Sequence, residues 1–97
     1  MKLNRDEIRD RVIRALHELL GPEDVPDIDE RTNPIKDLGN DSADGVDFAC
    51  RLSEVFAFHV PDKLNPFVDD ARHCPRSVGE IVELMLKLQP EEVSKHA

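Results

Sequence analysis

The apolar residues of this chain recur at helical spacing in three segments, and this periodicity constrains the fold more than any other feature. Residues 4–20, 42–56 and 78–89 place hydrophobic side chains three or four positions apart, as on one face of an amphipathic helix. No segment alternates apolar and polar residues as a half-buried strand does. A chain of 97 residues forms one domain, so the pattern predicts a single all-α bundle.

Local end signals support these helices. Asn4 is followed three residues later by Glu7, and Ser77 by Glu80, which is the pattern of a capping box. Gly21 follows the first periodic segment, and glycine is the commonest residue just past a helix C-terminus.

A fourth, shorter helix is predicted at 66–72. Asn65 precedes Pro66, and this pair is typical of a helix N-cap followed by proline at the first helical position. The side chains that this helix is expected to bury are Phe67, Val68 and Ala71.

A loop of about twenty residues, 21–40, separates the first two helices and is rich in Pro, Asp and Glu. Loops of this length are usually functional or disordered. An ordered loop is favoured by four apolar residues spaced along it: Val25, Ile28, Ile35 and Leu38. The predicted order is helix, long loop, helix, short helix and helix within residues 1–90, followed by a disordered tail at 91–97.

The charge of the chain is strongly and unevenly acidic. The net charge is −8, and residues 21–70 carry thirteen Asp and Glu against four Lys and Arg. Such a surface repels the phosphates of nucleic acids. It favours protein partners with basic patches, because complementary fields speed encounter and fix orientation.

Two cysteines, Cys50 and Cys74, do not make a disulfide framework. The N-terminal residues are charged, so no signal peptide is expected, and no segment reaches the roughly 20 apolar residues of a membrane span. These features predict a cytoplasmic protein, which we expect to be monomeric.

One hydroxyl lies among carboxylates at the expected start of the second helix. Ser42 follows Asp41 and precedes Asp44 and Asp47. A serine at an exposed helix N-terminus is a good acceptor for a covalent group, although no nearby base makes it a nucleophile. The alternative is that Ser42 only caps the helix. Because no base–nucleophile pair and no metal-ligand pattern is present, we expect neither an enzyme nor a metal site.

The second helix is expected to have two different faces. The face toward the core consists of Phe48, Ala49, Leu52, Val55 and Phe56. The opposite face is a stripe of small apolar residues flanked by acids, and it begins beside Ser42. Together with one acid of the preceding loop, it is expected to dock partner proteins through Asp37, Ala43, Asp44, Val46, Asp47, Cys50 and Glu54.

The sequence resembles the acyl carrier protein family in four landmarks that occur in the order typical of the family. They are DLGNDS at 37–42, VDFACRLSEVF at 46–56, HVP at 59–61 and RSVGEIV at 76–82. The family pattern is a D-L-G-x-D-S loop, an acidic recognition helix, an I/V-P turn and a T/S-V-G start to the last helix. The resemblance implies a four-helix acyl-carrier-like bundle over nearly the whole chain.

The same resemblance implies 4'-phosphopantetheine attached to Ser42 through a phosphodiester, with acyl intermediates carried as thioesters. It implies a phosphopantetheinyl transferase and acyl-transferring or synthase enzymes with basic patches as partners. Asp41 would assist the transferase, whose Mg²⁺ belongs to the transferase site. Phe67 and Val68 have the right character to line an acyl channel.

Several positions depart from the family pattern. Ala43 replaces the usual leucine, Arg51 and Cys50 are unusual on the second helix, and the segment 62–77 is extended. These differences favour a specialised fatty acid, lipid or polyketide pathway. Two alternatives stay open, namely a carrier of aminoacyl or peptidyl groups and a helical adaptor that is not pantetheinylated.

Overall fold

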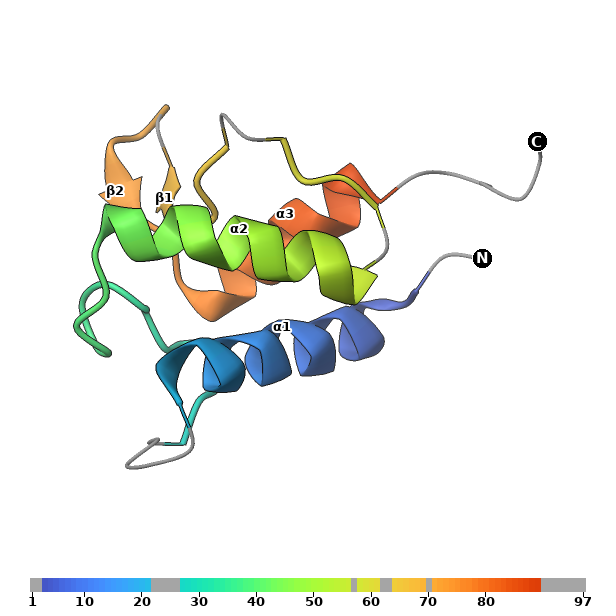
Figure 1. Ribbon diagram of the computed structural model, residues 1–97, viewed down its shortest axis with the longest axis horizontal. Coiled ribbons are helices and arrows are strands. Elements are labelled where there is room, and N and C mark those ends of the chain that lie inside the picture. The colour runs from blue at the N-terminus through green and yellow to red at the C-terminus, as the bar shows by residue number, and fades with distance from the viewer. Residues whose placement is uncertain (1–2, 22–26, 57, 62–63, 70, 90–97) are drawn as a thin grey trace.

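A computed structural model describes residues 3–21, 27–56, 58–61, 64–69 and 71–89 (Figure 1). These residues form a compact, mostly helical globule with three helices, one small two-stranded hairpin and a long loop between the first two helices. The elements in chain order are α1 (Arg5–Leu20), α2 (Ser42–Phe56), β1 (Val68–Asp69), β2 (Cys74–Pro75) and α3 (Val78–Leu88).

The core lies where the three helices meet. α1 contacts both α2 and α3, and it runs antiparallel to α2 (Figure 1). None of the helices in the described part of the chain combines the length and the apolar character that crossing a membrane requires. The buried hydrophobic side chains are Ile8, Val12, Ala15, Leu16, Phe48, Ala49, Leu52, Phe56, Val60, Phe67, Val78, Ile81, Val82 and Met85.

Both predicted capping boxes are confirmed. The Asn4 side-chain oxygen accepts a hydrogen bond from the Glu7 backbone amide at 2.9 Å, and the Glu7 carboxylate accepts one from the Asn4 backbone amide at 3.0 Å. Ser77 and Glu80 make the same reciprocal pair at 3.2 and 2.8 Å. Gly21 follows α1 with φ +95°, a conformation that glycine adopts without strain.

The long loop is ordered over the residues that the structure describes. Three of its four predicted apolar anchors, Ile28, Ile35 and Leu38, pack against the core, whereas Val25 lies outside the described residues. The loop also satisfies the start of α3, because the carbonyls of Thr32 and Glu30 accept hydrogen bonds from its first two amides at 2.7 and 2.9 Å. The tail predicted at 91–97 lies outside the described residues.

The short helix predicted at 66–72 is wrong. The described residues of this segment form a hairpin instead, in which β1 pairs antiparallel with β2. Asn65 does begin a turn, because its Oδ1 accepts from the Phe67 amide at 2.9 Å. The turn does not continue as a helix, since Asp69 Oδ1 accepts from the Ala71 and Arg72 amides at 3.1 and 3.2 Å. Such local side-chain bonds compete with helical ones, and Ala71 is exposed, not buried.

One arginine organises the base of this hairpin. Arg76 Nη1 donates to the carbonyl oxygens of Asn65 at 2.8 Å and of Val68 at 3.0 Å. The Arg76 amide also donates to the Phe67 carbonyl at 2.8 Å. A guanidinium presents several donors in a fixed geometry, so one side chain fixes carbonyls that a helix would have bonded internally.

Candidate functional site

The start of α2 is capped by Asp41, the residue that precedes Ser42. Asp41 Oδ1 accepts from the Asp44 amide at 3.0 Å, and Asp44 Oδ2 accepts from the Asp41 amide at 3.0 Å. This reciprocal pair is a capping box made from two aspartates. The alternative that Ser42 serves as the cap is therefore wrong, because Ser42 is the first residue of the helix itself.

Ser42 presents an unengaged hydroxyl. The residue is exposed, and in the described part of the chain no hydrogen bond involves its Oγ. Because the amides at a helix N-terminus point outward and the helix dipole is positive there, this position favours a phosphate. The loop that leads to it contains Gly39 with φ +76°, a backbone angle that suits glycine.

The faces predicted for α2 are found in the structure. Phe48, Ala49, Leu52 and Phe56 are buried, whereas Val55 is only half-buried and Gly45 joins the buried face. Among the described residues, Val46 is the one large hydrophobic side chain that is exposed, at 56%. The other residues expected to dock partners are exposed, except for the half-buried Asp44: Asp37, Ala43, Asp47, Cys50 and Glu54.

The acids around Ser42 fall into two groups. Asp41 and Asp44 are bonded to backbone amides in the capping box, and Asp37 Oδ2 accepts from the Asn33 amide at 2.7 Å. Asp47 and Glu54 make no hydrogen bond or ion pair with any described residue. The first group therefore shapes the loop and the helix start, whereas the carboxylates of the second are exposed at the surface of α2.

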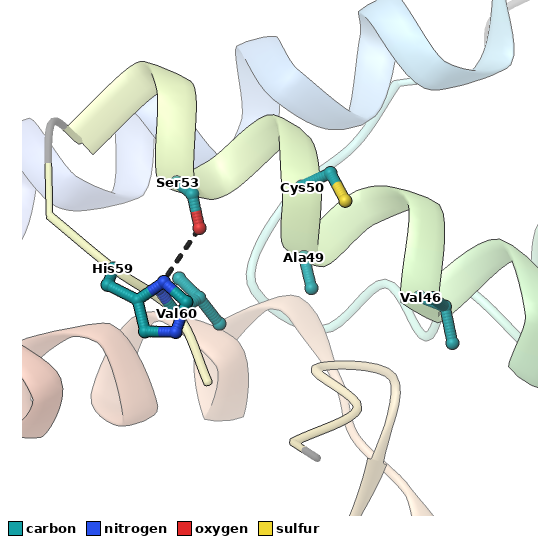
Figure 2. Close-up of a pocket in the computed structure, with 6 residues that line it drawn as sticks. All are labelled: Val46, Ala49, Cys50, Ser53, His59 and Val60. Carbon is teal, nitrogen blue, oxygen red and sulfur yellow. Dashed lines mark hydrogen bonds between the residues drawn. The ribbon is translucent and has the colours of Figure 1, made fainter. Parts of the chain in front are cut away.

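A groove of about 330 Å³ runs along α2 from a point one turn beyond Ser42. Figure 2 shows that four of its lining residues come from α2 and two from the segment that follows the helix. Its lining is mainly apolar, with the buried Ala49 and Val60 at its base. The six residues that line the groove are Val46, Ala49, Cys50, Ser53, His59 and Val60.

One hydrogen bond fixes the far end of this groove. Ser53 Oγ accepts from the Val60 amide at 3.0 Å (Figure 2), which ties the segment after α2 to the helix. At a rise of 1.5 Å per residue, Ser53 lies about 16 Å along the helix from Ser42. The groove itself spans about 10 Å of the helix, from Val46 to Ser53.

The two residues expected to line an acyl channel lie elsewhere. Phe67 is fully buried and stacks on Phe48 with a centroid distance of 5.0 Å and an interplanar angle of 29°. Val68 is half-buried in β1, and neither residue lines the groove. A channel role for this pair stays a prediction, and the structure places Phe67 in the core.

The sequence contained a partial signal for the groove. Positions 46, 49, 50 and 53 follow the spacing of one helix stripe, and Val46 and Cys50 were identified as part of an outward stripe. Ser53, His59 and Val60 were missed, because the packing of the HVP segment against α2 depends on tertiary structure.

The described residues contain no group of three or more His, Cys, Asp or Glu side chains placed to hold a metal ion. Cys50 and Cys74 are free thiols, of which Cys50 is exposed at the groove and Cys74 is half-buried. No family model matches the chain, and no solved structure matches it.

Proposed function

We propose that this protein is an acyl carrier protein that holds 4'-phosphopantetheine on Ser42. The observation that carries the proposal is the exposed Ser42 hydroxyl at the first residue of α2, which no described residue engages because Asp41 takes the capping role. The DLGNDS sequence around it supports the same assignment. The protein would serve a specialised fatty acid, lipid or polyketide pathway.

The residues present fit the prosthetic group. The Ser42 hydroxyl is accessible to a transferase, and the helix N-terminus favours the phosphate that would be joined to it. When bound, the group supplies a thiol that carries acyl chains as thioesters. The apolar base of the groove, formed by Ala49 and Val60, would shield such a chain from water, because burying apolar surface is favourable.

The decisive experiment measures covalent modification. Purified protein is incubated with coenzyme A, Mg²⁺ and a broad-specificity phosphopantetheinyl transferase, and its intact mass is recorded. We expect the gain of one phosphopantetheine, located on Ser42 by peptide mass spectrometry. Absence of any gain would instead support the unmodified helical adaptor. If the modified protein were then loaded with amino acids only, and not with acyl chains, an aminoacyl or peptidyl carrier would be supported.

The position of the groove predicts which methyl groups change their NMR shifts when an acyl chain binds. When the modified protein is loaded with a medium-length acyl chain, we expect the largest methyl NMR shifts at Val46, Ala49 and Val60. These side chains line the groove. Shifts that were largest at Val68, or confined to Ala43, would contradict this location.

The free acid Asp47 predicts a docking effect. Asp47→Lys is expected to lower the rate of transferase modification roughly three- to tenfold at low salt, because rim charges act mainly on association. The difference should shrink as salt is added. Stability should change by less than about 0.5 kcal/mol, since Asp47 is exposed and makes no bond in the described structure.

The matched control is Glu18→Lys, the same charge reversal at an exposed position on α1. Equal rates for the two variants would show that net charge, and not the face of α2, governs docking.

A further inference from the structure

We infer that Asn65 is a positioning residue for Ser42, holding the first turn of α2 so that the hydroxyl is fixed for modification. The inference rests on the proposed function, and it assigns a role to the hairpin segment that the resemblance left unexplained. Figure 1 shows the hairpin beside the start of α2.

Both ends of the Asn65 amide are engaged. Its Nδ2 donates to the Ser42 carbonyl oxygen at 2.9 Å, and its Oδ1 accepts from the Phe67 amide at 2.9 Å. The side chain therefore bridges the hairpin segment and the residue proposed to be modified.

The bridge lies directly against Gly45. A Cβ atom built on this buried glycine would overlap the Asn65 side chain, with Oδ1 the nearest atom. Glycine in a helix interior is unfavourable relative to alanine, so its presence here is explained by the close approach of Asn65. The contact leaves no room for any side chain at position 45 while Asn65 stays in place.

The hairpin holds Asn65 rigidly. The backbone carbonyl oxygen of Asn65 accepts a hydrogen bond from Arg76 Nη1 at 2.8 Å. Two residues further along, the Phe67 ring is fully buried against Phe48. Because helix ends fray, an anchored donor on the Ser42 carbonyl restrains the first turn from one side, while the Asp41–Asp44 capping box restrains it from the other.

The reaction that benefits is a group transfer. Ser42 Oγ attacks the phosphorus that bears pantetheine in a pyrophosphate donor such as coenzyme A. A serine P–O bond forms, the bridging P–O bond breaks, the nucleoside bisphosphate leaves, and the serine proton passes to a base of the transferase. Asn65 touches none of these atoms, and its effect is to orient the nucleophile, on which reaction rates depend strongly.

The first test replaces the donor. Asn65→Asp keeps an oxygen for the Phe67 amide, but it places a carboxylate oxygen, which cannot donate, against the Ser42 carbonyl oxygen. We expect kcat/KM for modification to fall about five- to tenfold, as the loss of one hydrogen bond predicts. Asn4→Asp is the control, because it makes the same substitution at the N-cap of α1, where Asp caps equally well.

The second test uses Gly45. Gly45→Ala is expected to slow modification about as much as Asn65→Ala, because the added methyl group displaces the Asn65 side chain. The double variant should then be no slower than Asn65→Ala alone, since the displaced group is already absent. Effects that multiply in the double variant would overturn the inference.

Amide hydrogen exchange provides a readout apart from modification. In unmodified Asn65→Asp, exchange at Gly45 and Val46 is expected to speed up at least threefold, while exchange at Met85 in α3 stays unchanged. Modification of Asn65→Asp at the wild-type rate would overturn the positioning role. If Asn65→Asp also loosens β1, amide exchange at Val68 will speed up. In that case the comparison of Gly45→Ala, Asn65→Ala and the double variant decides whether Asn65 positions Ser42. Failure of the wild-type protein to be modified would overturn the proposed function instead.

Discussion

Ser42→Ala is expected to abolish phosphopantetheinylation while the protein stays fully folded. The substitution removes the hydroxyl proposed to accept the group, and Ser42 Oγ makes no hydrogen bond with any described residue. Since Asp41 caps α2, the roughly 1 kcal/mol that the loss of a cap costs does not apply. Alanine favours the helix more than serine does, so the free energy of unfolding should change by less than about 0.5 kcal/mol.

Intact mass spectrometry and urea unfolding measure the two parts of this prediction. Ser53→Ala is the matched control on the same helix. Its hydroxyl accepts from the Val60 amide, so this variant should be modified normally and lose about 1 kcal/mol of stability. A Ser42→Ala protein that still gained the prosthetic mass would show that another residue is the acceptor.

The helices were predictable because their signals are local. The periodic segments at 4–20 and 42–56 correspond to α1 and α2 within one residue. The capping pairs Asn4–Glu7 and Ser77–Glu80 each act within a single turn. Neither feature depends on what the rest of the chain does, so sequence spacing alone was sufficient.

The hairpin was missed because one of its main determinants is not local. The turn signal at Asn65-Pro66 was correct, but the path that follows depends on Arg76, which bonds carbonyls eight and eleven residues earlier in the sequence. No spacing rule indicates that contact. His73 also has a positive φ of +55°, which is uncommon for any residue other than glycine.

The candidate site was predictable in part for the same reason. Helical spacing indicated which face of α2 points outward, and the exposure of Val46 and Asp47 agrees with it. The sequence left a capping role open for Ser42 and did not indicate Asp41 as the cap, since Asp and Ser are both preferred caps and adjacent positions look alike in sequence. The groove required the contact between Ser53 and Val60, which only the folded chain shows.

Phe67→Ala is expected to lower the free energy of unfolding by about 3–5 kcal/mol, the cost typical of deleting a buried phenylalanine. The ring is fully buried and stacks on Phe48, so its removal loses both apolar burial and an aromatic contact. Small domains have a total stability of about 5–15 kcal/mol, which makes this a large fraction. Val68→Ala is the control, and its half-buried side chain should cost about 1 kcal/mol.

Urea unfolding of the two variants separates a core role from a channel role. If Phe67 lines an acyl channel and contributes little to the core, its loss would lower the free energy of unfolding by less than about 1.5 kcal/mol. The NMR shifts that acyl loading causes around position 67 would then differ between Phe67→Ala and the wild-type protein. If it belongs to the core, the stability loss is large and the groove shifts at Val46 and Val60 persist in the protein that remains folded. The buried Phe67 ring holds the backbone whose amide donates to Asn65 Oδ1. A core role therefore further predicts slower modification of Ser42 in Phe67→Ala than in Val68→Ala.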